Sequence, residues 1–432
     1  MENRVLDLIP GFGEVVLRKK AGLTARVSVS KGAAGFSSFM RGRLAEDVAL
    51  YVQRIDAHCA VPQHLAAVSA LDRCYHVAPP KKAIAMRRAL AYAGFYFHHL
   101  EELFLSRAGG SDGTSGLIST DESILVGDAF SAVTLSQELI TLLGGREITP
   151  ERGIPGGLSS GISDEGIDQA KRDASQLLSF ALRAEEAFRA SGAAWVKVQD
   201  LTVPAYSLAT VEKDSAVSLY DGDLCIVDER GKEWAKGEAI DILPKLLSWK
   251  EDLPLRVGPL ARLNVGKIST SQARSLQEKM FDTLGGPPLH LVAAGHWQTV
   301  IELVQASELL AQALSEVESG NSGITSPLGK PDEGIAAIEG GNGTTVHRYV
   351  LDEQGIVQEA QVFLPRQVQA GSINVALASV IGSNDEVSET TIERIADVIR
   401  ANRPAFVPTA VLPLRVTLRD EVGKVSQEWR RP

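Results

Sequence analysis

Cysteines, basic clusters and long apolar runs are all scarce in this chain, and each scarcity excludes a class of protein. The three cysteines, Cys59, Cys74 and Cys225, are too few and too scattered for a disulfide framework in 432 residues. No dense group of lysines and arginines is present, and the net charge of −10 argues against nucleic acid or an anionic membrane as a partner. No uncharged apolar stretch reaches the length that spans a bilayer.

What the chain does have is the composition of a globular protein. Its hydrophobic content of 44% and charged content of 23% suit a domain with a sizeable core. The first residues, MENRVLDLIPGFGEVV, lack a basic region followed by an apolar run, so no secretory signal is expected. We therefore expect a cytoplasmic protein.

Hydrophobic periodicity predicts an α+β protein that is mainly helical. Alternating residues from Glu14 and again from Leu23 indicate an N-terminal hairpin. Asp352–Gly355 is expected to be a hairpin turn, and Glu318–Asp332 a surface loop or linker. Helices are expected at 44–55, 81–107, 127–143, 165–192, 296–318 and 388–402, and strands at 204–228 and 335–364.

The segment QRIDAHCAVPQHLAA holds a dense group of potential metal ligands. Asp56, His58, Cys59 and His64 offer the carboxylate, imidazole and thiolate groups that bind zinc or another transition metal. Strong zinc signatures pair cysteines or histidines twice, whereas this segment does so once at most. From spacing alone, the favoured interpretation is a buried cysteine that packs as a small hydrophobe, with a histidine at a helix start.

The other histidines and a glycine-rich segment favour structural roles. Neighbouring helix positions point about 100° apart, so His98 and His99 should not share a ligand face, and one is expected to be buried and the other exposed. His296 and His347 are single histidines in apolar or strand contexts. Gly340–Gly343 lacks the Lys-Ser/Thr that closes a phosphate loop, so a β-turn is expected there.

A series of longer motifs runs through most of the chain. They lie at 36–43 (FSSFMRGR), 46–47, 52–55, 64–72, 144–146, 155–157, 258–265 (GPLARLNV), 296–297 and 345–349. In order and spacing they resemble the large subunit of nickel–iron hydrogenases, in the soluble cytoplasmic group that works with ferredoxin, heterodisulfide or nicotinamide partners. The resemblance extends from about residue 12 to about residue 418.

That resemblance implies the hydrogenase large-subunit fold, which is α+β and mainly α, with a central long-helix bundle and peripheral β-hairpins. It also implies a single domain over residues 1–432. Its expected parts are an N-terminal β-hairpin region at 1–35, a helical core at 36–200, a β-containing segment at 201–265, more of the helical core at 266–319, and a C-terminal α/β segment at 333–432.

The metal-binding motifs of that family are largely replaced in this sequence. The resemblance implies four cysteines in two Cys-x-x-Cys motifs, but Asp56 stands at the first cysteine and only Cys59 remains. The segment Leu414–Gly423, which includes Asp420, has no cysteine, and the histidine where a maturation protease would stop is also missing. One surviving thiolate cannot bridge two metals and also supply their terminal ligands.

Groups around the metals are replaced as well. Gln63 stands where the family has a histidine, and Asn342 where it has an arginine over the active site. Lys20-Ala21-Gly22 stands where it has the Glu-Gly-His of a proton relay, and a lysine there would repel a proton. No catalytic or cofactor-binding residue is therefore expected. The vestigial-site positions are Asp56, Cys59, Gln63, Asn342 and Asp420.

These replacements predict that the nickel–iron centre is absent and that the chain cannot activate hydrogen. We expect a structural or electron-transfer subunit of a cytoplasmic redox complex, not catalytic by itself and without a cofactor of its own. The expected partner is an iron–sulfur small subunit of hydrogenase type, with room for further electron-transfer subunits. The clusters should lie on that partner, because a cubane cluster normally takes four thiolates.

Two alternatives remain open at this point. In the first, the emptied cavity, lined by Asp56, His58, Cys59, His98 and Asp420, is a repurposed redox or ligand-binding site for a small soluble ligand or one zinc ion. The quinone-site subunit of respiratory complex I, a hydrogenase relative that lost its metal, is the precedent. In the second, the chain is an active nickel-dependent hydrogenase large subunit with unusual ligands.

Overall fold

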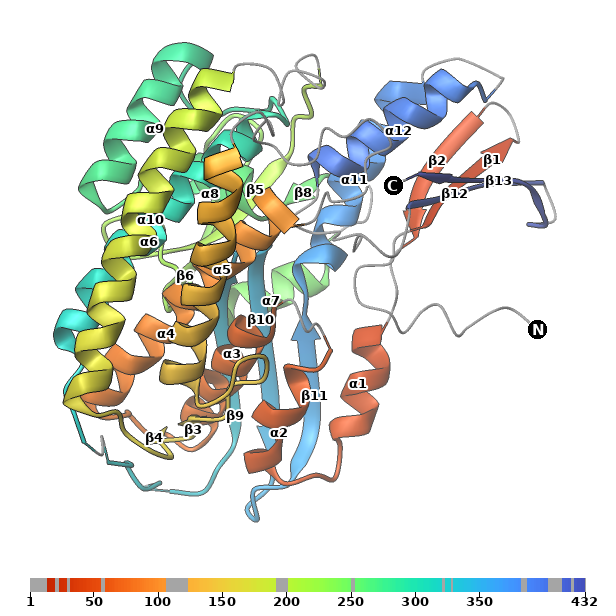
Figure 1. Ribbon diagram of the computed structural model, residues 1–432. Helices are drawn as coiled ribbons and strands as arrows, with labels where there is room; N and C mark the ends of the chain where they lie inside the picture. Colours follow the sequence, from red (N-terminus) through yellow and green to blue (C-terminus); the bar gives the residue numbers. More distant parts are fainter. Residues whose placement is uncertain are drawn as a thin grey trace.

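A bundle of long helices makes up one side of the molecule, and three β-sheets lie along and beyond its other side (Figure 1). The helices are α1 (Gly32–Met40), α2 (Ala45–Val52), α3 (Ala60–Cys74), α4 (Lys81–Leu100), α5 (Ser123–Gly144), α6 (Asp164–Ser191), α7 (Ala239–Leu247), α8 (Pro259–Val265), α9 (Ser271–Leu284), α10 (Ala294–Glu316), α11 (Pro365–Ile381) and α12 (Glu389–Ala401). The computed structural model describes residues 14–19, 23–28, 32–55, 59–105, 123–191, 201–249, 253–320, 323–327, 329–381, 387–402, 414–420 and 423–431.

The strands form four separate sheets. An antiparallel sheet has the order β11-β10-β9, a second has the order β7-β6-β5-β8, a third has the order β13-β12-β1-β2, and β3 pairs with β4. The strands are β1 (Glu14–Lys19), β2 (Leu23–Ser28), β3 (Gly153–Ile154), β4 (Gly157–Leu158), β5 (Tyr206–Val211), β6 (Asp223–Val227), β7 (Glu233–Gly237), β8 (Leu255–Arg256), β9 (Glu333–Gly340), β10 (Gly343–Leu351), β11 (Val357–Phe363), β12 (Leu414–Arg419) and β13 (Val425–Arg431).

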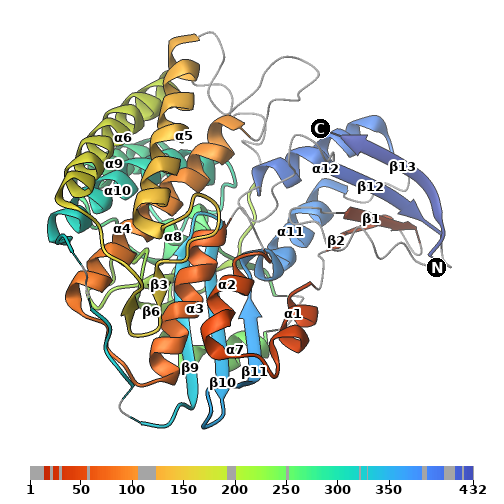
Figure 2. The same ribbon diagram turned by 60° about the horizontal axis from the view of Figure 1, so that its bottom comes forward.

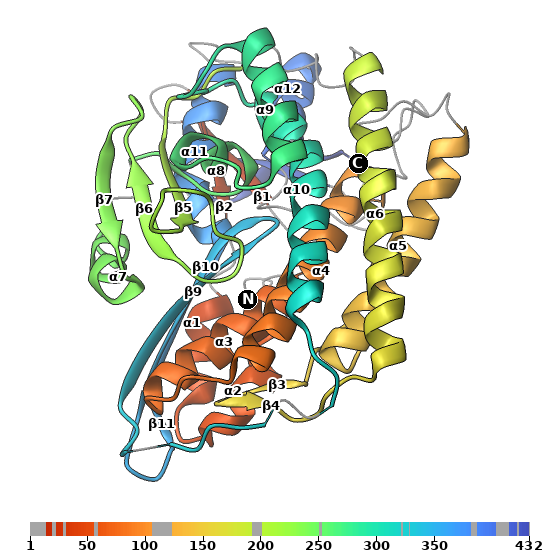
Figure 3. The same ribbon diagram turned by 90° about the vertical axis from the view of Figure 1, so that its left-hand side faces the viewer.

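Helix α4 is the centre of the bundle. It packs against α10, α5 and α3, and Figure 3 shows α10, α6 and α5 running side by side around it. Apolar side chains occur on every face of α4, because Ala89, Leu90, Phe95 and Leu100 all belong to the main core. A helix segment that is apolar all round is typically a buried one, and no residue of α4 from Ala89 to Leu100 is exposed, so this half of α4 runs through the protein interior.

The terminal sheet joins the two ends of the described chain. β1 pairs with β2 in an antiparallel hairpin and with β12 in parallel register, so that Val16 lies opposite Thr417. Figure 2 shows this sheet beside α11 and α12, away from the helix bundle. Ile373 and Leu377 of α11 and Val15 of β1 share its own apolar core.

Most of the expected elements are present. The N-terminal hairpin and the turn at Asp352–Gly355 are confirmed by their hydrogen bonding. The long helix expected at 81–107 instead ends at Leu100 and continues as a π-helical turn, η3 (Glu101–Leu105). Helices α9 and α11 were not expected from the sequence. None of the helices in the described ranges combines the length and the apolar character needed to cross a bilayer.

Candidate functional site

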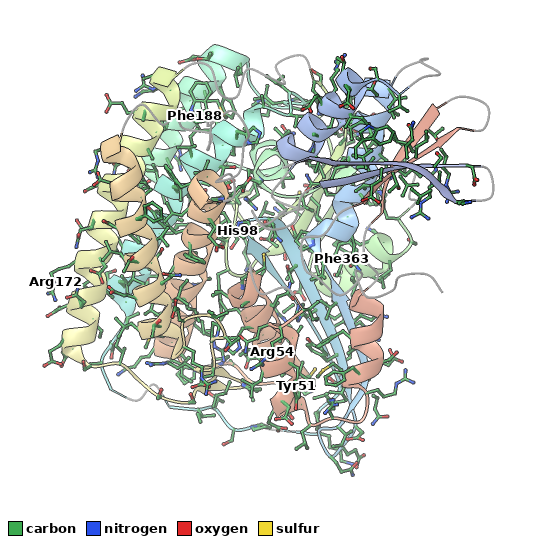
Figure 4. The ribbon with its side chains drawn as sticks, turned by 45° about the vertical axis from the view of Figure 1, so that its right-hand side comes forward. Tyr51, Arg54, His98, Arg172, Phe188 and Phe363 are labelled. Carbon is green, nitrogen blue, oxygen red and sulfur yellow. The ribbon has the colours of Figure 1, made fainter. Side chains whose placement is uncertain are left out.

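A cavity of about 270 Å³ lies where α3 begins, between α4 and the turn that joins β9 to β10. Cys59 and Pro62 line it on the α3 side, and His98 lines it on the α4 side. Gly340 and Gly341 line it from the turn. Figure 4 shows His98 where the end of α4 meets this hairpin. Residues of α5 and of the segment that follows it complete the lining, so the walls come from several separate parts of the sequence.

Two glycines allow these walls to approach each other. A Cβ atom on Gly94 would lie 2.7 Å from two carbons of Val61, so the missing side chain lets α4 pack closely on α3. A Cβ atom on Gly341 would lie 2.4 Å from Nδ1 of His98, so the turn packs directly against the imidazole ring. Real Cβ contacts are not this short, and any larger residue would displace a wall.

A buried ion network stands directly behind the turn. The guanidinium of Arg262, in α8, donates two hydrogen bonds to Glu302, at 2.9 Å from Nε and 2.6 Å from Nη2. Its Nη1 donates to Glu339 at 2.8 Å. The same guanidinium also donates to the carbonyl oxygens of Gly340 and Gly341, at 3.0 Å each. Arg262 therefore fixes the backbone of the cavity wall as well as the two carboxylates.

The pKa values in this network follow from burial and from the partners of each group. Burial raises the pKa of Glu302, but the bidentate contact with Arg262 and the contact with His99 outweigh it and bring the pKa to about 2. Burial raises the pKa of Glu339, and the weaker contact with Arg262 does not outweigh it. Burial lowers the pKa of His99, so this imidazole is neutral. The network thus holds an ionised Glu302 against a neutral histidine.

Three potential metal ligands meet at the end of α4. One nitrogen from each of His98 and His99 and one carboxylate oxygen of Glu102 lie within 4.8 Å of one another. In the part of the chain that the structure describes, this is the one such group of three. The expectation that one histidine would be exposed is wrong: His98 and His99 are both buried, since α4 is surrounded by other elements.

The stretch QRIDAHCAVPQHLAA does not assemble as one ligand group among the described residues. Asp56 and His58 lie outside the described residues. Cys59 is buried and lines the cavity, but His64 is not among the described residues that line it. The Nδ1 of His64 lies 3.4 Å from the carbonyl oxygen of Ala49, and burial lowers its pKa to about 4. His64 is therefore a neutral packing residue of the α3 core.

Sequence reasoning missed the residues that carry the charge of the site. Arg262 lies in the GPLARLNV motif, and Glu302 and Glu102 lie on helices. The signal for them was a charged residue within an otherwise apolar stretch: Glu102 is followed by Leu-Phe-Leu, and Glu302 stands within Val-Ile-Glu-Leu-Val. Buried charges are rarely found without a partner, so these positions could have been singled out.

Comparison with known proteins identifies the fold and a group of distant relatives. No family model matches the chain. An F420-non-reducing hydrogenase iron-sulfur subunit from Archaeoglobus profundus is 27% identical to it, over 92% of each chain. An F420-non-reducing hydrogenase subunit from Methanothermobacter thermautotrophicus is 28% identical over 86% of each chain. A crystal structure of NAD+-reducing [NiFe]-hydrogenase in the H2-reduced state matches 90% of this chain and 94% of its own, with a TM-score of 0.74 and 21% identity.

This chain is a homologue of the nickel–iron hydrogenase large subunits. It has their fold, mainly helical with β-sheets, as the sequence predicted. The NAD-reducing hydrogenase HoxS subunit beta of Cupriavidus necator is a further relative, 25% identical over 92% of each chain. The similarity to these three relatives extends over 86–92% of the chain, and not over one motif.

Gln63 and Asn342, two of the positions where the homologue departs from the family pattern, are both buried near the cavity. Oε1 of Gln63 accepts a hydrogen bond from Nε2 of His347 at 2.8 Å, and Nδ1 of His347 accepts one from the hydroxyl of Tyr349 at 2.8 Å. Burial lowers the pKa of His347 to about 3, which keeps this ring neutral. Asn342 is buried in the β9–β10 turn. Gln63 thus makes a buried structural hydrogen bond with His347.

Asp420 is not brought to the cavity. It is exposed, and it lies in the turn between β12 and β13, where its carboxylate accepts a hydrogen bond from the backbone N–H of Lys424 at 2.8 Å. Lys20, Ala21 and Gly22 lie outside the described residues. Of the expected vestigial positions that the structure describes, Cys59, Gln63 and Asn342 lie at or near the cavity and Asp420 does not.

The cysteines do not fit a nickel–iron centre. The sequence holds three, and two of them are buried elsewhere. The thiol of Cys74 contacts the carbonyl oxygen of Tyr349 at 3.5 Å, and burial raises its pKa to about 12. Cys225 lies in β6, and burial raises its pKa to about 11. The cavity can therefore offer one thiol, that of Cys59, against the four thiolates that the family resemblance implies.

Proposed function

We propose that this chain is a hydrogenase large-subunit homologue that does not activate hydrogen and acts as a structural or electron-transfer subunit of a cytoplasmic redox complex. The observation that carries the proposal is the cavity with one thiol in a fold that is otherwise retained. Soft thiolate ligands suit nickel and low-spin iron, and the carboxylate and amide groups around Cys59 are poor replacements. No catalytic step is therefore assigned to a metal at this position.

An iron–sulfur small subunit is the partner that this proposal implies. With Cys74 and Cys225 buried apart from Cys59, the chain cannot supply four thiolates to a cubane cluster, so the redox centres belong on another subunit. Exposed apolar side chains suited to a partner are Phe39 on α1, Leu44 directly before α2, and Leu50 on α2. Groups of exposed apolar side chains can mark interaction sites.

The test is affinity purification of the full chain from its native host, followed by metal analysis of the eluate. We expect iron and acid-labile sulfide without nickel, together with a cysteine-rich partner. Stoichiometric nickel, with infrared bands from carbonyl and cyanide on iron, would instead identify an active hydrogenase. A chain that purifies alone as a stable monomer would contradict the proposal that it has an iron–sulfur partner.

Paired surface variants sharpen the partner test. Leu44→Ser with Leu50→Ser should reduce recovery of the iron–sulfur partner, because both side chains are exposed and need no repacking. The matched control is Ile240→Ser with Leu247→Ser, an exposed apolar pair on α7. If the α7 variant loses the partner and the Leu44/Leu50 variant keeps it, the partner binds at α7 and the proposed surface is wrong.

A repurposed ligand site is the second candidate, favoured by the persistence of the cavity. It keeps about 270 Å³ of space and is lined by ionisable side chains, among them Cys59, His98 and Glu101. A small soluble ligand that binds there should raise the melting temperature of the wild type, and Asp56→Ala or Cys59→Ser should abolish the shift. A metabolite panel that produces no shift would count against this candidate.

A further inference from the structure

We propose that His98, His99 and Glu102 bind a single divalent transition-metal ion of the zinc class on the α4 side of the cavity, without the thiol of Cys59 as a ligand. Their potential ligand atoms lie within 4.8 Å of one another, and all three side chains are at most 5% exposed. The group comes from the end of α4 and the π-helical turn that follows it. It contains no sulfur.

The orientation of His99 is the first argument. Its Nε2 lies 2.8 Å from Oε2 of Glu302, and Arg262 holds that same carboxylate in a bidentate contact. A carboxylate paired with a guanidinium accepts hydrogen bonds, so Nε2 carries the proton and Nδ1 carries the lone pair. Nδ1 is buried and has no hydrogen-bond partner among the described residues. A metal-binding histidine typically donates its other N–H to a carboxylate in this way.

The position of His98 is the second argument. Its Nδ1 faces the backbone of Gly341, where a Cβ atom would lie only 2.4 Å away. We therefore assign Nε2 as the ligand nitrogen of this ring. Arg262 donates to the carbonyl oxygen of Gly341, so the same guanidinium that orients His99 through Glu302 also fixes the surface behind His98. Both imidazoles are held in place before any ion arrives.

The π-helical turn supplies the third ligand. In a regular α-helix, neighbouring residues point about 100° apart, which argues against a shared site for two adjacent histidines. The turn Glu101–Leu105 changes the helix register directly after His99. Glu102 comes to lie beside both imidazoles, and π-bulges of this kind are frequent at functional sites. A π-helical turn thus accounts for a ligand group that α-helical spacing would not form.

The chemistry of the group selects the class of ion. Two imidazole nitrogens and one carboxylate oxygen are a ligand set that zinc accepts, with a fourth position left for water or another ligand. Imidazole also suits cobalt and nickel, whereas calcium and magnesium prefer oxygen alone. The adjoining network has one guanidinium, from Arg262, against two carboxyl groups, from Glu302 and Glu339. Arg262 is thus already engaged by these two groups, and a bound divalent cation would compensate the buried carboxylate of Glu102.

The test is titration of the full chain, purified with any partner that accompanies it and treated with a chelator, with Co²⁺ and then Zn²⁺. We expect one equivalent of Co²⁺ with the visible absorption of a four- or five-coordinate site, displaced by one equivalent of Zn²⁺. Glu102→Gln and His98→Gln should weaken binding by more than the roughly 10- to 100-fold that changes in outer-shell partners cause. Glu186→Gln, which alters an exposed carboxylate on α6, should leave binding unchanged.

Three outcomes would overturn the proposal. The first is the absence of stoichiometric Co²⁺ binding by the wild type. The second is unchanged affinity in Glu102→Gln that is folded by circular dichroism. The third is a thiolate-to-cobalt charge-transfer band that disappears in Cys59→Ser, because the ion would then belong to the cavity thiol. If the Glu102 variant does not fold, X-ray absorption of the zinc-loaded wild type decides: nitrogen and oxygen scatterers alone support the site, and sulfur excludes it. None of these results depends on whether the chain activates hydrogen.

Discussion

The α3 side and the α4 side of the cavity use their polar side chains in opposite ways. On the α3 side, Gln63 is hydrogen-bonded to His347, and Nδ1 of His64 lies against the carbonyl oxygen of Ala49. The polar groups near Cys59 therefore make neutral, structural contacts. On the α4 side, His98, His99 and Glu102 converge, and His99 is oriented by an ionised carboxylate. The α3 side is where the family resemblance places metal ligands, and the α4 side is where this chain places them.

The difference lies in the charge that each side buries. On the α3 side the described groups Gln63, His64 and His347 are neutral, so no buried charge there needs a counterion. The α4 side remains charged because Arg262 compensates Glu302 and Glu339 and also holds the β9–β10 turn. The predictions below test each side separately, beginning with the largest expected effect.

Removing Arg262 should have the largest effect on stability. Arg262→Ala leaves Glu302 and Glu339 buried without their cation, and breaking such a buried pair costs about 3–5 kcal/mol. The free energy of unfolding from urea titration measures the loss. The matched control is Arg183→Ala, which breaks an exposed pair with Asp128 and should cost less than about 1 kcal/mol. Equal losses in the two variants would show that the network does not stabilise the α4 side.

Acid should destabilise the α3 side through its neutral histidines. The folded-state pKa is about 4 for His64 and about 3 for His347, both below the ordinary histidine value of 6.5. The unfolded chain therefore binds protons first as the pH falls. Stability should be fully present above pH 6.5 and should decline toward pH 4, by up to about 1.4 kcal/mol per pH unit for each histidine.

Urea titrations between pH 7 and pH 4.5 measure this slope. His64→Asn removes one of the titrating groups, so the slope of that variant should be shallower by about one proton. A slope identical to that of the wild type would mean that His64 is not buried in its neutral form.

Placing a methyl group on the turn should disturb the α4 side alone. In Gly341→Ala the added Cβ would lie 2.4 Å from Nδ1 of His98, and such overpacking typically costs about 1–3 kcal/mol. Thermal unfolding measures this loss, and the affinity for Co²⁺ should fall in the same variant. Gly329→Ala is the control, because no atom lies within 4 Å of the Cβ it would add. Unchanged stability and affinity in Gly341→Ala would show that His98 does not rest on this turn.

The most limited effect is expected from the hydrogen bond between Gln63 and His347 on the α3 side, because its loss should change stability and not Co²⁺ affinity. Gln63→Leu leaves the Nε2–H of His347 without its acceptor in a buried position, which costs about 1–3 kcal/mol. Co²⁺ binding should not change, because Gln63 is not part of the ligand group on α4. Gln358→Leu, at an exposed position, serves as the control for the substitution itself. A change in Co²⁺ affinity with Gln63→Leu would show that the two sides of the cavity are coupled.

Sequence patterns predicted the elements that depend on neighbouring residues. The β1–β2 hairpin was predicted because alternation and turn residues lie within 15 positions of one another. Helix α11 was missed because Pro365–Ile381 spreads its apolar residues around the helix and includes Gly371. The pairing of β1 with β12 could not be predicted from local patterns, because it joins strands about 400 positions apart.

The candidate site was predictable only in part, for a related reason. Gln63 and Asn342 could be singled out because they interrupt motifs of the family that the sequence resembles, and Cys59 because it keeps its place in one of them. His98 and His99 are both buried because α4 packs against α3, α5 and α10. These contacts are long-range, so they cannot be predicted from a short stretch of sequence. Glu102 joins them only because the helix changes to a π-helical turn, and single-sequence periodicity assumes a constant repeat.

The parallel pairing of β1 with β12 also determines the order in which the molecule can be completed. A ribosome adds roughly 5–20 residues per second, so β1 emerges about 20–80 s before the strand that it pairs with. During that interval β1 has only β2 as a neighbour, and an isolated hairpin is marginally stable with an open edge. The terminal sheet therefore closes only when β12 has been synthesised. A nascent chain that stalls before this strand would keep an unpaired edge that chaperones and proteases can recognise.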